Sequence, residues 1–93
     1  MATRRVDFTV TSKGGVQGSW IAVGGDDVPL VNDEGSITLQ SPKTHFLVWW
    51  FVGNPGAKLT IEGKVGQQTV VEVKESTIPP GQTEGAGSKR FDV

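Results

Sequence analysis

The chain contains a single histidine, His45, and this is the first residue at which catalysis would be sought. A nucleophilic triad places a histidine beside a serine and a carboxylate, but no G-x-S-x-G elbow is present. The sequence also lacks cysteine, which excludes a catalytic thiolate, a disulfide framework, a thiolate zinc site and an iron–sulfur cluster. We therefore expect a protein that is not an enzyme and carries no cofactor.

A second group of residues could bind a metal ion. Asp26, Asp27, Asn32, Asp33 and Glu34 lie within nine residues of one another, and Ca²⁺ takes its oxygen ligands from loops of this kind. The D-x-[DN]-x-[DN]-G pattern of an EF-hand is absent, however, and Asp and Asn are also common turn formers. The sequence predicts no metal site, with Asp26, Asp27, Asp33 and Glu34 as the only calcium candidate.

The overall charge points to no charged partner. Nine basic and ten acidic side chains nearly balance, so no strong field favours nucleic acid or an anionic membrane. Gly14–Gly18 matches neither a P-loop nor a dinucleotide-binding pattern. The longest apolar run, 46–52, is too short to span a bilayer, and 1–10 lacks the apolar segment of a signal peptide. We expect a cytoplasmic protein, and secretion after removal of a leader stays open.

The remaining pattern is that of β-strands. Apolar residues alternate in short runs that recur roughly every ten residues between Gly, Pro, Asn and Asp clusters, and no helical periodicity is present. The predicted strands span 5–11, 19–23, 28–31, 36–40, 45–52, 57–65, 68–75 and 89–93.

Seven or eight short strands in a single domain, 1–93, are best accommodated by two antiparallel sheets packed face to face. The alternative is a small open β-barrel. The strand rhythm, with a tryptophan on a central strand, resembles the immunoglobulin-like and fibronectin-like sandwiches. This resemblance implies a fold only, because such folds carry many unrelated functions.

One predicted strand, 45–52, is apolar on both faces, whereas a sandwich strand has one face toward solvent. Its core face depends on register. If 53–56 is a hairpin turn and Val52 pairs with Ala57, then Trp50 lies opposite Leu59 on an apolar face. A register shifted by one residue would reverse the two faces. The apolar match predicts that Trp50 lies in the core and that Trp49 lies outside.

With this register, Leu47, Trp49 and Phe51 form an apolar stripe on the outer face of a sheet, and exposed apolar stripes usually mark contact surfaces. The possible covers are a second copy of the chain, another protein, a sugar ring, or a loop of the same chain. The candidate loops are 79–88 and the segment around Pro29.

From these observations we expect a non-catalytic protein-interaction or self-association module, with a homodimer or a complex with another protein as its product. The predicted contact residues are Leu47, Trp49 and Phe51, with His45 and Trp20 nearby. The alternative is a carbohydrate-binding domain that uses Trp49 as its stacking platform.

Overall fold

The computed structural model describes residues 2–93, which form eight β-strands and no helix. The strands are β1 (Ala2–Lys13), β2 (Val16–Val23), β3 (Asp26–Val28), β4 (Glu34–Ser41), β5 (Thr44–Gly53), β6 (Lys58–Val65), β7 (Gln68–Thr77) and β8 (Glu84–Asp92).

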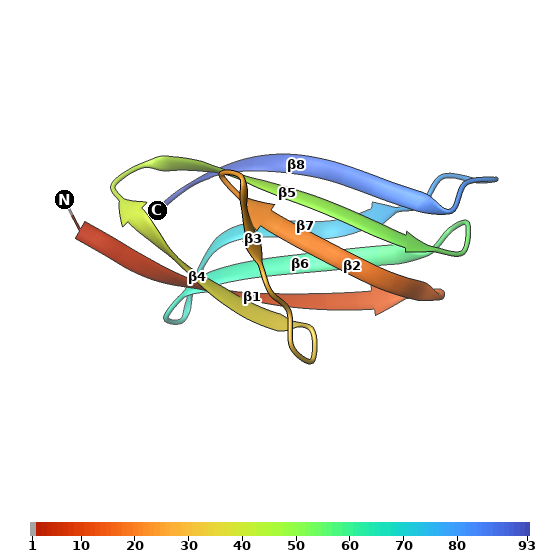
Figure 1. The fold of residues 1–93 in the computed structure, drawn as a ribbon, viewed down its shortest axis with the longest axis horizontal. Helices are drawn as coiled ribbons and strands as arrows, with labels where there is room; N and C mark the ends of the chain where they lie inside the picture. The colour runs from red at the N-terminus through yellow and green to blue at the C-terminus, as the bar shows by residue number, and fades with distance from the viewer. Residues whose placement is uncertain (1) are drawn as a thin grey trace.

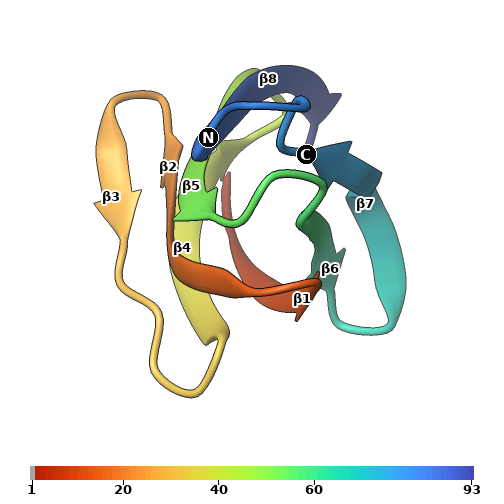
Figure 2. The ribbon, with the colours of Figure 1, turned by 90° about the vertical axis from the view of Figure 1, so that its right-hand side faces the viewer.

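These strands form two four-stranded sheets (Figure 1). The first sheet has the order β4-β1-β6-β7 and the second the order β3-β2-β5-β8, and every neighbouring pair is antiparallel. The end-on view shows the two layers around a common interior, with β3 and the chain after it standing away from the body beside β2 (Figure 2). The predicted small β-sandwich is confirmed.

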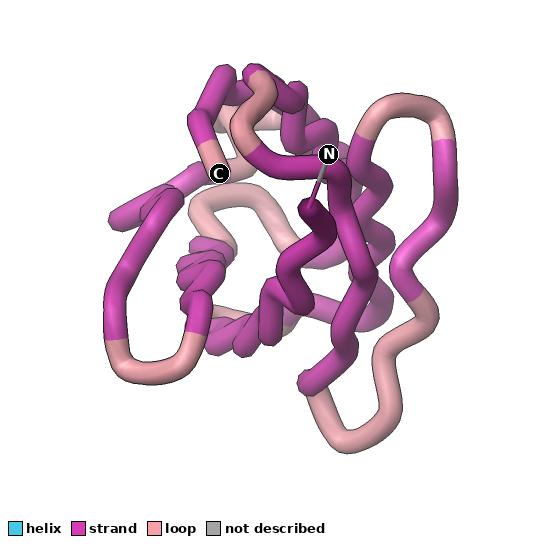
Figure 3. The backbone as a smooth tube through the Cα atoms, turned by 90° about the vertical axis from the view of Figure 1, so that its left-hand side faces the viewer, coloured by secondary structure: helices cyan, strands magenta, loops and turns pink. Residues whose placement is uncertain are grey.

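Most connections pass from one sheet to the other. Only β2–β3 and β6–β7 are consecutive strands that pair with each other; every other pair of consecutive strands is divided between the sheets. The connections are short loops (Figure 3), and the molecule is elongated along the strands, with principal extents of 46 × 22 × 20 Å.

Two strands differ most from the sequence prediction, whereas the bounds of the other six lie within three residues of the predicted ones. β3 is Asp26–Val28 and not 28–31, because its ladder with β2 ends at Val28 and Pro29 has no N–H to continue it. β8 begins at Glu84, so half of the predicted loop 79–88 is a strand paired along β5.

The core lies between the sheets and is built from the alternating apolar residues of each strand. Val6, Phe8 and Val10 of β1 point inward. The rings of Phe8 and Phe91 meet edge to face, with centroids 6.5 Å apart, and join the two sheets. The other buried apolar residues are Ile21, Val23, Val28, Leu39, Leu47, Trp49, Phe51, Ala57, Leu59, Ile61, Val71, Val73 and Ile78.

The predicted hairpin between β5 and β6 is wrong. Its turn forms as expected, because Gly56 has a φ of 84° and the Ala57 N–H donates to the Asn54 carbonyl over 3.0 Å. However, the turn carries the chain from the second sheet to the first, so β5 and β6 never pair. A Pro-Gly turn can connect two strands of different sheets as readily as two paired strands of the same sheet.

Without that hairpin, the two faces of β5 are the reverse of the prediction. Leu47 and Phe51 are fully buried and Trp49 is 7% exposed, so these residues face β6 across the core. Trp50, predicted to be in the core, is 45% exposed.

The neighbouring strand β8 explains why Leu47, Trp49 and Phe51 face the core and Trp50 faces solvent. Gly85 pairs with Phe51 and Gly87 with Trp49. A Cβ atom at Gly85 would lie 2.6 Å from Phe51 Cε1, and one at Gly87 would overlap with the Trp49 indole. Because these glycines carry no side chain, the two large rings pack directly over the β8 backbone. The opposite faces of β5 and β8 are left to solvent.

Candidate interaction surface

The outer face of the second sheet carries a contiguous group of exposed apolar side chains. Phe46, Val48 and Trp50 follow one another along the outer face of β5, and Trp20 of β2 lies directly opposite Trp50. Their exposed fractions are 55%, 47%, 45% and 50%, respectively. We call these four residues the aromatic face.

The two tryptophans of the aromatic face hold each other in place. Their rings stack with centroids 4.7 Å apart and an interplanar angle of 27°. The edge of the Trp20 ring lies against Gly18, where an added Cβ atom would be 3.1 Å from Cη2. Offset stacking of two indoles is worth about 0.5–1.5 kcal/mol beyond area burial. The pair therefore forms a preformed ridge rather than two independent side chains.

Small residues flank this ridge, and charged residues lie beyond it. Ala22 pairs with Val48 on one side, and Ala86 and Ser88 pair with Trp50 and Val48 on the other. Further along β8, Glu84 lies opposite Val52 and Arg90 opposite Phe46.

The outer face of the first sheet has the opposite character. Its central strand β1 presents Thr3, Arg5, Asp7, Thr9 and Thr11 to solvent. All three ion pairs found among residues 2–93 belong to this sheet, and the shortest joins Arg5 Nε to Asp7 Oδ1 at 2.8 Å.

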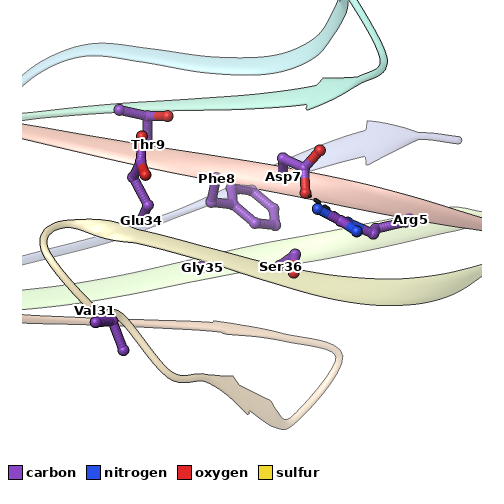
Figure 4. A pocket seen from close by; sticks show the side chains of 8 residues that line it. All are labelled: Arg5, Asp7, Phe8, Thr9, Val31, Glu34, Gly35 and Ser36. Atoms are coloured by element: carbon purple, nitrogen blue, oxygen red, sulfur yellow. Dashed lines mark hydrogen bonds and ion pairs between the residues drawn. The ribbon is translucent and has the colours of Figure 1, made fainter.

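A depression of ≈ 420 Å³ lies on this polar side, where the chain after β3 passes beside β1 and β4. Figure 4 shows the Arg5–Asp7 ion pair at one end of it and Thr9 beside Glu34 at the other. Its charged side chains are thus partly engaged with each other, and no exposed aromatic residue lines it.

The residues predicted as the contact stripe are not on the surface. Leu47, Trp49 and Phe51 belong to the core, and the Trp49 Nε1–H donates to Ser76 Oγ over 2.9 Å. A buried, hydrogen-bonded indole cannot serve as a stacking platform for a sugar, so the Trp49 platform is also wrong.

The two other predicted contact residues, Trp20 and His45, lie on opposite faces of the second sheet. Trp20 does lie on an exposed sheet face, as part of the aromatic face. His45 is half-buried on the opposite side of β5; its Nε2 lies 2.9 Å from the Gln40 carbonyl oxygen, and its ring centroid lies 5.9 Å from that of Phe91. These contacts give His45 a packing role at the end of the core.

The calcium candidate is not assembled. Asp26 and Asp27 belong to β3, Glu34 begins β4, and Asp33 lies in the turn between them with a φ of 63°. Within residues 2–93, no group of three or more acidic, histidine or cysteine side chains is placed to hold a metal ion. The turn-forming interpretation of Asn32 and Asp33, both at positive φ, agrees with the structure.

Neither candidate loop covers the aromatic face. Residues 84–88 are part of β8 and lie in the plane of the sheet. The segment that follows β3 comes close only at a notch of ≈ 400 Å³, lined by Trp20, Pro29 and Leu30 among others. The four aromatic-face side chains remain about half exposed.

Sequence reasoning missed Phe46, Val48 and Trp50 as surface residues, although one signal was present. Gly85 and Gly87 alternate with the small residues Ala86 and Ser88. Glycine in the interior of a strand often marks the close approach of another group, and here that group is the pair of core rings.

No family model, curated protein or solved structure matches this chain. Among the described residues, no helix has the length and apolar character needed to cross a membrane.

Proposed function

We propose that this chain is a non-catalytic protein-interaction module and that the aromatic face is its contact surface. The observation that carries this proposal is the contrast between the two outer faces. One face is polar and holds the three ion pairs, and the other presents a stacked tryptophan pair with a phenylalanine and a valine.

Physical chemistry supports a contact role for such a face. At half exposure, these four side chains offer roughly 400 Å² of apolar surface. Patches of about 300–600 Å² are the largest found on typical monomers and are often functional. Tryptophan is also enriched among the residues that dominate binding energies.

The stacking of the two tryptophans and the residues around them favour a protein partner over a carbohydrate. One ring face of Trp20 and one of Trp50 are already occupied by their mutual stacking. The small neighbours of the ridge and the charges at its rim suit an apolar partner surface with a polar border, as protein interfaces have. The immunoglobulin-like character of the sandwich stays a part of this proposal and assigns no activity.

The proposal can be tested by site-specific photo-cross-linking in cells. A benzophenone amino acid in place of Val48 sits at the centre of the aromatic face, and the same probe in place of Thr9 sits on the polar face. We expect protein adducts, with this chain or with another protein, from position 48 and none of comparable yield from position 9.

Equal adduct yields from the two positions, or none from either, would contradict the proposal. Binding to a glycan array that is lost in Trp50→Ala, without protein adducts from position 48, would replace it with the carbohydrate alternative.

A further inference from the structure

We propose that the occupant of the aromatic face is a second copy of this chain, bound through a two-fold axis that runs across the strands of the second sheet. This inference rests on the proposed function and specifies its partner. A two-fold interface needs only one surface, provided that the surface is complementary to itself. The register of β2, β5 and β8 shows that the outer face of the second sheet meets this condition.

The axis is defined by one row of paired residues. Ile21, Trp49 and Gly87 lie side by side on β2, β5 and β8. With the axis above this row, each strand of one copy lies over the same strand of the partner, and the two run in opposite directions. A residue that comes one position before the row in its strand therefore lies over the partner residue that comes one position after the row. The same holds for residues two or three positions away.

This arrangement places large side chains over small ones. Trp50 lies over the partner's Val48, because both are one position from Trp49. By the same rule, Trp20 lies over the partner's Ala22. The ridge of each copy therefore meets the lower part of the other, and the two tryptophan pairs do not collide.

The same axis also pairs opposite charges. Glu84 and Arg90 lie three positions on either side of Gly87, and alternation along β8 places both on the outer face. In the dimer, Glu84 lies over the partner's Arg90, and Arg90 over the partner's Glu84. Neither residue takes part in an ion pair within residues 2–93 of one copy, so both charges are free for the contact.

A two-fold axis parallel to the strands fits poorly by comparison. Such an axis above β5 would place Trp50 directly over the partner's Trp50 and Glu84 over a glycine, the partner's Gly18. Two large tryptophan side chains would then lie against each other, and Glu84 would have no oppositely charged side chain opposite it. The observed distribution of size and charge therefore selects the axis across the strands.

The available area suits a dimer of modest affinity. Small specific interfaces bury about 1,200 Å² in total, and the apolar part of this face supplies roughly 400 Å² from each copy. The rim around Ala86, Ser88, Glu84 and Arg90 contributes the remainder. Because facing sheets pack about 10 Å apart, the Glu84 and Arg90 side chains are long enough to meet across the contact.

The test is a charge swap with the purified full chain, followed by molar mass measurement across about 10 μM to 1 mM, the range expected for weak interfaces. We expect the native chain to approach a dimer. Glu84→Arg places two like-charge contacts in the interface, and so does Arg90→Glu, so each should raise the dissociation constant about tenfold or more. Glu34→Arg makes the same charge change on the polar face and should leave the dimer unaffected.

Restoration of the dimer gives the decisive result. In an equimolar mixture of Glu84→Arg and Arg90→Glu, each arginine meets a glutamate of the other chain, so a heterodimer should form at the native concentration. The double variant should form a homodimer for the same reason. Retained circular dichroism of each single variant shows that a loss of mass is not a loss of fold.

Three results would overturn the inference: a native chain that stays monomeric at every concentration, single swaps that leave dimerisation unchanged, or single swaps that are not rescued by mixing. A monomeric native chain that still gives photo-adducts with other proteins from position 48 would remove the dimer and keep the interaction function.

Discussion

Trp49 and Trp50 are neighbours in the chain, but their environments differ completely. Trp49 is 7% exposed and hydrogen-bonded to Ser76, and Trp50 is 45% exposed and stacked on Trp20. Successive strand residues point to opposite faces, so one substitution at each position separates core packing from surface contact within the same strand.

Trp49→Ala should lower the free energy of unfolding by about 3–5 kcal/mol, because it deletes a core aromatic ring and leaves a cavity. Trp50→Ala should lower it by less, about 1–2.5 kcal/mol, because it loses the stacking on Trp20 and only the buried part of a half-exposed side chain. Urea unfolding of both variants at low protein concentration measures the difference. Equal costs, or a larger cost for Trp50→Ala, would contradict the assignment of the two faces.

At the scale of elements, β5 and β8 determine each other's orientation. Large rings on the inner face of β5 lie over Gly85 and Gly87, and the outer faces carry Trp50 against Ala86. Beside these two rings β8 has no side chain, so Phe51 and Trp49 can pack over its backbone, and Gly85 and Gly87 favour the orientation that turns both rings inward.

Gly87→Ala should therefore destabilise the fold by about 1–3 kcal/mol through overpacking against the Trp49 ring, although alanine suits a strand better than glycine does. Ser88→Ala, on the outer face of the same strand, is the control and should cost little. The urea midpoints of both variants provide the measurement.

A double variant shows whether the cost of Gly87→Ala comes from the predicted overlap. In a Trp49→Val background the added methyl group meets no ring, so Gly87→Ala should be tolerated there, and the two effects should be non-additive. Additive costs would show that the overlap with the indole is not the cause.

At the scale of the whole molecule, the two sheets share one core but face solvent differently. The polar face balances its charges by ion pairs between neighbouring residues, whereas the second sheet keeps Glu84 and Arg90 at the border of an apolar surface. In the proposed dimer, the aromatic face lies in the contact and the polar face stays in solvent.

If two copies associate only in the folded state, then association adds to stability by mass action. The urea midpoint of the native chain should rise with protein concentration above the dimer dissociation constant, and that of Glu84→Arg should stay constant over the same range. Intrinsic fluorescence follows the transition at each concentration. A native midpoint that does not depend on concentration would argue against a folded dimer.

Much of the fold follows from sequence pattern alone. The alternation of apolar residues such as Val6, Phe8 and Val10, the turn at 53–56 and the glycines between the runs predicted short strands in a two-sheet sandwich. These features are local: period-2 alternation and turn chemistry depend on residues a few positions apart.

The candidate surface could not be predicted from the sequence in the same way, because β5 is apolar on both faces. Alternation shows that Phe46, Val48 and Trp50 share one face and that Leu47, Trp49 and Phe51 share the other. It does not show which face is inside when both could be buried. That choice belongs to strands distant in sequence: β8 offers room over its glycines, and β6 lies across the core rather than beside β5. Only the tertiary structure places the tryptophan pair in solvent, because the free energy that buries one face of β5 comes from neighbours that the strand's own pattern does not encode.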